Sequence, residues 1–387
     1  MLKKLLIICL SINYIFFCNL YIFAEKTDEE AYNLEDIYYE TGLDDLITKY
    51  MDNQCLVEEF KNFSHQDMVG KKSKFFCFSP GKMFNIVCEH IKTEIKSPLK
   101  LIMGIIGIVL VSAFMEALKV CFSNNSVNEV VNCVCLLSIF IFIAYPLLEC
   151  VKSAVEVIVN ISSFMLGFIP VYAGIMSSCG MVVTSGVYNT FLFCICQVVS
   201  EVISQKLLPI VGIYIAFCLV SSIATNLNIS EMAKTVKNII TWVLEFIVAA
   251  FVGLITIQSV VACSADTVGT KTAKFLIGSA VPIIGGVISD AYTSMKGCFD
   301  FVRSSAGAMA IVFVLITCLP ILIKLAIWII MVKFSGGIAD FMGIKQVSAI
   351  LKSSNYAVEL LFAIIVSYIL LIIITITILL ILGLGLN

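Results

Sequence analysis

The side chains that could do chemistry in this sequence are ionisable residues set within or beside long apolar runs. They are Glu116, Glu156, Glu201, Glu245, Lys324 and Glu359. A charged group at the centre of a bilayer costs at least ~2.5–3.5 kcal/mol, so such residues normally face protein or water and often line a path for ions or solutes. We therefore expect a transport or packing role for them.

No group of residues predicts an enzyme. The two histidines, His65 and His90, lie outside the apolar region, and the sequence has no His-Glu-x-x-His motif. Most of the sixteen cysteines fall inside apolar runs, where a thiol behaves as a small apolar side chain. The sequence thus predicts no catalytic residue, no cofactor and no metal site, and nothing in it predicts nucleic-acid binding.

One polar stripe is predicted on a helix. Glu156, Asn160, Ser163 and Gly167 follow helical spacing and lead to an interruption at Pro170. The stripe could line a pathway, or its small and polar residues could hold neighbouring helices together. Both interpretations stay open.

Lys324 lies one turn after Pro320 and well inside an apolar run. We expect it to face a carboxylate, a freed carbonyl or water. Its partner, whether Glu156, Glu201 or neither, cannot be chosen from the sequence.

The apolar run 275–288 is short and broken, and a polar residue follows it closely. Its notable residues are Gly278, Pro282, Gly285, Gly286 and Asp290. A spanning helix needs about 20 residues, so we predict a re-entrant segment. It is the first candidate for a working centre.

The same pattern occurs twice, offset by 111 residues. Phe164, Gly167 and Gly174 correspond to Phe275, Gly278 and Gly285, and the match continues through the residues around Pro209 and Pro320. Gly/Pro-broken apolar segments at matching places in two halves are typical of duplicated membrane proteins. We predict an internal duplication. It is parallel if the signal-like start sets the orientation, and the parallel and inverted arrangements both stay open.

Composition predicts an all-α, polytopic integral membrane protein, because 60% of the residues are hydrophobic and only 13% are charged. We predict about eight spanning helices besides the re-entrant segment. They are 99–118, 130–148, 155–176, 182–203, 207–223, 242–262, 308–331 and 358–382.

The chain divides into five predicted parts. They are a signal peptide or uncleaved anchor (1–24), an acidic then basic extracytoplasmic segment (25–98), a first helical hairpin (99–150), membrane repeat 1 (151–262) and membrane repeat 2 (263–387). In this topology several lysines, among them Lys152 and Lys206, lie outside, against the positive-inside rule.

The run Pro282-Ile283-Ile284-Gly285-Gly286-Val287-Ile288-Ser289-Asp290-Ala291, followed by Gly297, Ala306-Gly307 and Pro320, resembles the stage III sporulation protein AE family of endospore-forming bacteria. The resemblance implies a protein in the mother-cell membrane around the forespore. It further implies a channel or secretion-like complex, needed for late forespore gene expression and forespore integrity. The implied partners are other products of the stage III sporulation A operon and a forespore membrane protein. The family carries no established catalytic residues.

Three functions follow as alternatives. The first is a subunit of that complex, forming part of its translocation pathway. The second is a free-standing secondary transporter of a small solute, and the third is a membrane scaffold without a conduit. Membrane lipid is a partner in each, and self-association is left open.

Overall fold

The computed structural model describes residues 96–118, 125–178, 181–223, 229–280 and 285–383, and all of these segments are helical apart from short turns. The helices are α6 (Lys96–Leu118), α7 (Asn125–Ser178), α8 (Val182–Glu201), a π-helical segment η1 (Val202–Leu207), α9 (Leu208–Ile223), α10 (Ile229–Ala280), α11 (Gly285–Phe341) and α12 (Lys345–Gly383). The predicted all-α class is confirmed for these residues.

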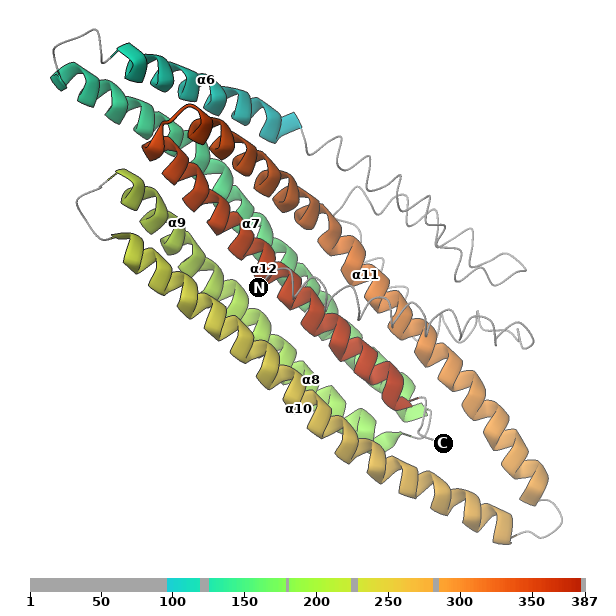
Figure 1. Cartoon of the computed structure of the whole chain (residues 1–387). Coiled ribbons are helices and arrows are strands. Elements are labelled where there is room, and N and C mark those ends of the chain that lie inside the picture. Colours follow the sequence, from blue (N-terminus) through green and yellow to red (C-terminus); the bar gives the residue numbers. More distant parts are fainter. Residues whose placement is uncertain (1–95, 119–124, 179–180, 224–228, 281–284, 384–387) are drawn as a thin grey trace.

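The helices form one elongated bundle, running up and down along a common axis (Figure 1). α12 lies inside it and packs against α11, α9, α10 and α7. Its face toward these neighbours is almost continuously apolar and buried, with Leu361, Ile365, Leu371 and Ile376 wholly enclosed. Burial of this helix supplies the largest share of the hydrophobic contacts that hold the bundle together.

Two turns close the hairpins by the same kind of hydrogen bond. At the end of α11, Gly343 adopts a φ of +77°, and the Ile344 amide donates to the carbonyl of Ala339 over 3.1 Å. Left-handed glycine with such a backward bond is a common helix terminator. After α7, the Met181 amide donates to the Met176 carbonyl over 3.1 Å, so α8 begins folded back along α7.

The number of spans differs from the prediction. Among the described residues, five helical stretches are long and apolar enough to cross a membrane: Val134–Ser178, Asn189–Phe217, Glu231–Ile257, Ser305–Phe341 and Gln346–Ile378, with Pro98–Phe114 as a shorter apolar helix. The predicted spans 130–148 and 155–176 are parts of one helix, α7, and 182–203 and 207–223 form one helical rod. The charges that separate each pair do not end a helix.

The duplication stays a prediction. α7 crosses the predicted boundary at residue 150, and α10 crosses the one at 262, so these boundaries are not turns of the chain. Figure 1 shows the α8–α9 rod and α11 running one way, and α10 and α12 running the other. A parallel duplication predicts the same directions. The predicted N-terminal parts, 1–24 and 25–95, lie outside the described residues.

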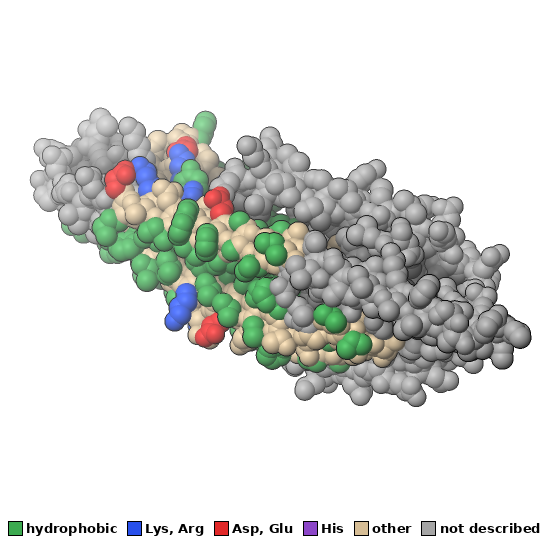
Figure 2. Space-filling model, turned by 90° about the horizontal axis from the view of Figure 1, so that it is seen from below, with side chains coloured by type: hydrophobic (Ala, Val, Ile, Leu, Met, Phe, Trp, Pro, Cys, Tyr) green, Lys and Arg blue, Asp and Glu red, His purple; other side chains and the backbone are tan. Residues whose placement is uncertain are grey.

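Hydrophobic side chains also dominate the surface. Figure 2 shows a face on which they cover most of the described area, while acidic and basic side chains form only small groups. Exposed apolar residues of this kind include Met103, Phe114, Ile141, Tyr145 and Trp242. Such a surface fits contact with lipid or with other apolar protein faces.

Candidate functional site

Lys324 has a defined carboxylate partner, and that partner is Glu149. The Lys324 ammonium on α11 lies 3.0 Å from Glu149 Oε1 on α7 and 3.4 Å from Ser153 Oγ. The lysine side chain is 19% exposed and the glutamate side chain 54% exposed. The ammonium is therefore largely enclosed by protein, while the carboxylate still reaches the surface.

This contact extends the stripe predicted on α7. Glu149 lies four residues before Ser153, and Ser153 lies three residues before Glu156, so all three share one helical face. Along this face Glu156 is exposed, and Asn160 and Gly167 are half-buried. The structure thus joins Lys324 to the stripe, although through residues other than the expected ones.

The two partners considered from the sequence, Glu156 and Glu201, are both exposed. Both carboxylates point to the surface of the bundle. Glu149 escaped the sequence prediction because a boundary was drawn between residues 148 and 155, at the charges. Had that helix been treated as continuous, the periodicity Glu149-x₃-Ser153-x₂-Glu156 would have placed Glu149 one turn further along the same face.

Next to the stripe, a buried polar junction joins three helices. Tyr368 on α12 shares a 2.8 Å hydrogen bond with Ser200 Oγ on α8, and its hydroxyl donates to the Ile158 carbonyl of α7 over 3.4 Å. Ser204 Oγ in η1 donates to the Ser200 carbonyl over 2.6 Å. Since these groups are buried, their hydrogen bonds fix the relative level of the three helices along the bundle.

Pro170, Pro209 and Pro320 all lie within continuous helical rods, so the predicted interruption at Pro170 is wrong. Pro170 does not interrupt its helix, because α7 runs on to Ser178, and Pro320 lies inside α11. Pro209 differs, since it follows the π-helical segment directly. A proline removes the hydrogen bond to the carbonyl four residues earlier, and a widened turn is one way to accommodate that loss.

The Gly/Pro run is the tip of a long helical hairpin. Gly278 lies in the last turn of α10, whereas Gly285, Gly286 and Asp290 lie at the start of α11. Pro282 lies outside the described residues, and nothing is described of the side chains around this tip. The predicted re-entrant segment stays a prediction, and its two sides belong to helices of 52 and 57 residues. The tip lies at one end of the bundle (Figure 1).

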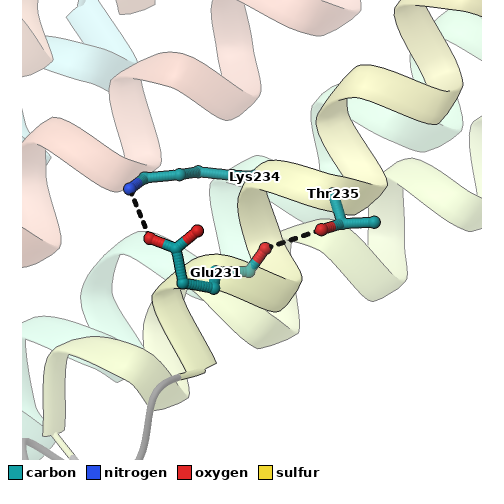
Figure 3. A network of polar contacts seen from close by, with 3 residues as sticks. All are labelled: Glu231, Lys234 and Thr235. Carbon is teal, nitrogen blue, oxygen red and sulfur yellow. Dashed lines mark hydrogen bonds and ion pairs between the residues drawn. The ribbon is translucent and has the colours of Figure 1, made fainter.

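Ion pairs gather at the opposite end, around the turn between α11 and α12. Lys352 contacts Asp340 at 2.8 Å, with Ser348 donating to the same carboxylate. Lys333 contacts Glu359 at 2.7 Å. At the nearby start of α10, Glu231 contacts Lys234 at 2.7 Å and its carbonyl accepts from Thr235, as Figure 3 shows. These pairs are mainly exposed and suit an aqueous or headgroup environment.

The site offers charge and hydrogen bonding rather than covalent chemistry. Within the described segments, no three His, Cys, Asp or Glu side chains lie close enough to hold a metal ion. Cys135, Cys150, Cys196 and Cys318 are buried free thiols. The stripe with Lys324 can bind an ion, orient water or pair with a neighbouring helix.

The chain is similar in sequence to one known protein family and to one characterised relative. The family model described as stage III sporulation protein AE matches residues 59–383. The stage III sporulation protein AE of Bacillus subtilis (strain 168) is 21% identical over 299 residues, which cover 74% of this chain and 73% of that protein. No solved structure matches.

Proposed function

Because the chain belongs to the stage III sporulation protein AE family, we propose that it is a membrane subunit of a complex joining mother cell and forespore during endospore formation. The family match confirms the resemblance predicted from the run around Pro282, and it supports a role in sporulation. The proposed partners are other products of the stage III sporulation A operon and a forespore membrane protein. The proposed location is the mother-cell membrane around the forespore.

One observation favours a subunit over a free-standing transporter. Val130, near the start of α7, and Val182, beside its end, are both exposed. At 1.5 Å per residue, α7 separates their levels by about 70 Å, whereas the hydrocarbon core of a bilayer is ~30 Å thick. A single bilayer cannot cover both ends of this apolar surface. Partner proteins in an obligate complex would cover the part that the bilayer leaves exposed.

The α7 stripe supports a second element of the proposal, a translocation pathway. Glu149, Ser153, Glu156 and Asn160 present polar groups along a helix that is otherwise apolar, and Lys324 contacts the first two. If a partner helix covers this face, the polar groups line the interface between α7 and that helix. A scaffold without a conduit would use the same face only for packing. We propose no enzymatic activity.

Assembly can be tested on the exposed apolar face of α7. Replacing Ile141 and Tyr145 together by Asn should lower co-purification of the partner membrane proteins at least tenfold and reduce spore yield, with the variant still present in the membrane. The matched control is Lys234→Asn, which alters an exposed residue on the charged side of the bundle. Full co-purification with the double variant would refute the assembly proposal.

The conduit is tested separately. Lys324→Met and Glu156→Gln should each reduce late forespore gene expression while leaving partner co-purification intact. Normal expression at normal protein levels would favour the scaffold. Flux of a small solute into liposomes that contain only this chain would instead favour the free-standing transporter.

A further inference from the structure

Each of the five long helical rods contains a stretch without an acidic or basic side chain in the same half of the bundle. Each stretch is roughly 20 residues long, the length that crosses a hydrocarbon core as a helix. The stretches are 157–178 in α7, 182–200 in α8, 246–265 in α10, 304–323 in α11 and 360–383 in α12. We call them the charge-free segments. In the other half only two rods contain a second such stretch, 130–148 in α7 and 207–223 in the α8–α9 rod.

Contacts place these segments side by side. Tyr368 bonds to Ser200 and to the Ile158 carbonyl, so α12, α8 and α7 share one level there. The rings of Phe164 and Phe313 stack with centroids 4.0 Å apart, which aligns α7 with α11.

The fifth segment, in α10, is aligned by a contact outside it. The Lys237 ammonium lies 4.8 Å from the centre of the Tyr356 ring. Since α10 and α12 run in the same direction (Figure 1), residue 246 falls near the level of residue 365. The five segments therefore form one slab.

A ring of charges bounds the slab on one side. We counted 1.5 Å per residue along each helix from these contacts. By this measure, eight ionisable residues lie within about 12 Å of one another along the bundle axis. They are Glu149, Lys152, Glu156, Glu201, Lys206, Glu245, Lys324 and Glu359. All eight are exposed or half-buried, and we call them the mid-bundle belt.

Trp242 lies at the level of the belt. Its side chain is 65% exposed and stacks on Phe246 at 5.8 Å. Tryptophan is enriched where a membrane meets water, and long charged side chains collect at the same depth. The belt and Trp242 together have the residue composition typical of protein that lies in a lipid headgroup layer.

The other side of the slab ends at the turn between α7 and α8. There Arg303 is fully buried, and its Nη1 lies 3.2 Å from Met181 Sδ. Among the described helices, α10 and α11 extend past this level. Their sequences carry charges again there, including Asp266, Lys271 and Asp290. Charged residues thus return on both sides of a slab as thick as a bilayer.

We propose that the hydrocarbon core surrounds the five charge-free segments and that the mid-bundle belt lies in one headgroup layer. The half of the bundle beyond the belt, with α6 and residues 125–148 of α7, then projects about 35 Å from the membrane. A bilayer placed around this projecting half instead would enclose the Lys352–Asp340 and Glu231–Lys234 pairs, each carrying an insertion penalty.

Depth can be measured with two conservative tryptophan probes in the full-length chain, purified and reconstituted in phosphatidylcholine vesicles. The background is Trp242→Phe, and Trp328, which is buried, stays in both variants. Phe193→Trp places the probe in the charge-free slab. Tyr145→Trp places it in the projecting half, at a site that is also exposed. Ile257→Trp, at an exposed position well inside the segment 246–265, replaces Phe193→Trp should that variant fail to accumulate.

Lipids brominated near the chain ends should quench the Phe193→Trp probe at least twofold more than lipids brominated near the headgroup. For Tyr145→Trp, the deep bromines should quench less than the shallow ones or not at all. Deep quenching of Tyr145→Trp equal to that of Phe193→Trp would overturn the proposal. Because the measurement uses the isolated chain, its outcome is independent of assembly with sporulation partners.

Discussion

The contact between Lys324 and Glu149 predicts an asymmetry between two substitutions. Glu149→Leu removes the carboxylate and leaves an ammonium that is only 19% exposed, whereas Lys324→Met leaves a carboxylate that is 54% exposed. Water can solvate the second group far better than the first. The two changes should therefore destabilise the bundle unequally, although they delete the same ion pair.

Breaking a fully buried pair by removing one partner costs ~3–5 kcal/mol, and breaking an exposed pair costs ~0–1 kcal/mol. Lys324 is near the buried limit but keeps Ser153 Oγ at 3.4 Å, so we expect about 2 kcal/mol for Glu149→Leu. For Lys324→Met we expect ~0–1 kcal/mol. At roughly 2–4 °C per kcal/mol, the midpoints should fall by about 4–8 °C and ~0–4 °C.

The assay is thermal unfolding of the purified protein in detergent, followed by the loss of the monodisperse peak in size-exclusion chromatography. The double variant should lie close to Lys324→Met alone, because no stranded ammonium remains. Equal losses for the two single variants, or additive losses in the double, would show that the ammonium is not enclosed as described.

Two further predictions concern packing inside the slab. Tyr368→Phe should cost about 1 kcal/mol, measured by the same unfolding assay. Adding Ser200→Ala should cost little more, because Tyr368→Phe has already removed the hydrogen bond that these two side chains share. Gly307→Ala should destabilise the fold, since a Cβ there would lie 2.6 Å from Leu380 Cδ2, and overpacking costs typically ~1–3 kcal/mol. Gly253→Ala is its control, with no atom within 4 Å of the added carbon, and should be neutral or stabilising.

The sequence was sufficient for the class and the family but not for the number of rods. Hydropathy divided α7 at Glu149 and Lys152, and the α8–α9 rod at Lys206, because charges lower the local apolar average. A charged side chain does not end a helix; loss of backbone hydrogen bonding or a left-handed residue does. Gly343 provides such an end, while the three charged positions do not.

The pairing of Lys324 could not have been predicted, because its partner lies 175 residues away in the sequence and depends on how α7 and α11 dock. Burial of the lysine followed from its apolar surroundings alone. The structure also changes the balance of lysines. With the proposed bilayer, Lys152 and Lys206 lie on the same side as Lys234, Lys333 and Lys352, whereas the predicted spans placed them on opposite sides.

The π-helical segment Val202–Leu207 changes the direction in which the buried side of its rod faces. A π turn contains one residue more than an α turn, and one residue corresponds to a rotation of about 100° around a helix axis. The buried side of α9, with Val211 and Tyr214, is therefore rotated relative to the side that α8 would present if the α-helix had continued. Deleting one residue within the segment would turn the whole of α9 while leaving α8 in place. The segment therefore sets the rotation of α9 relative to α8, so that α9 packs against α12 and α10 while α8 packs against α7 and α10.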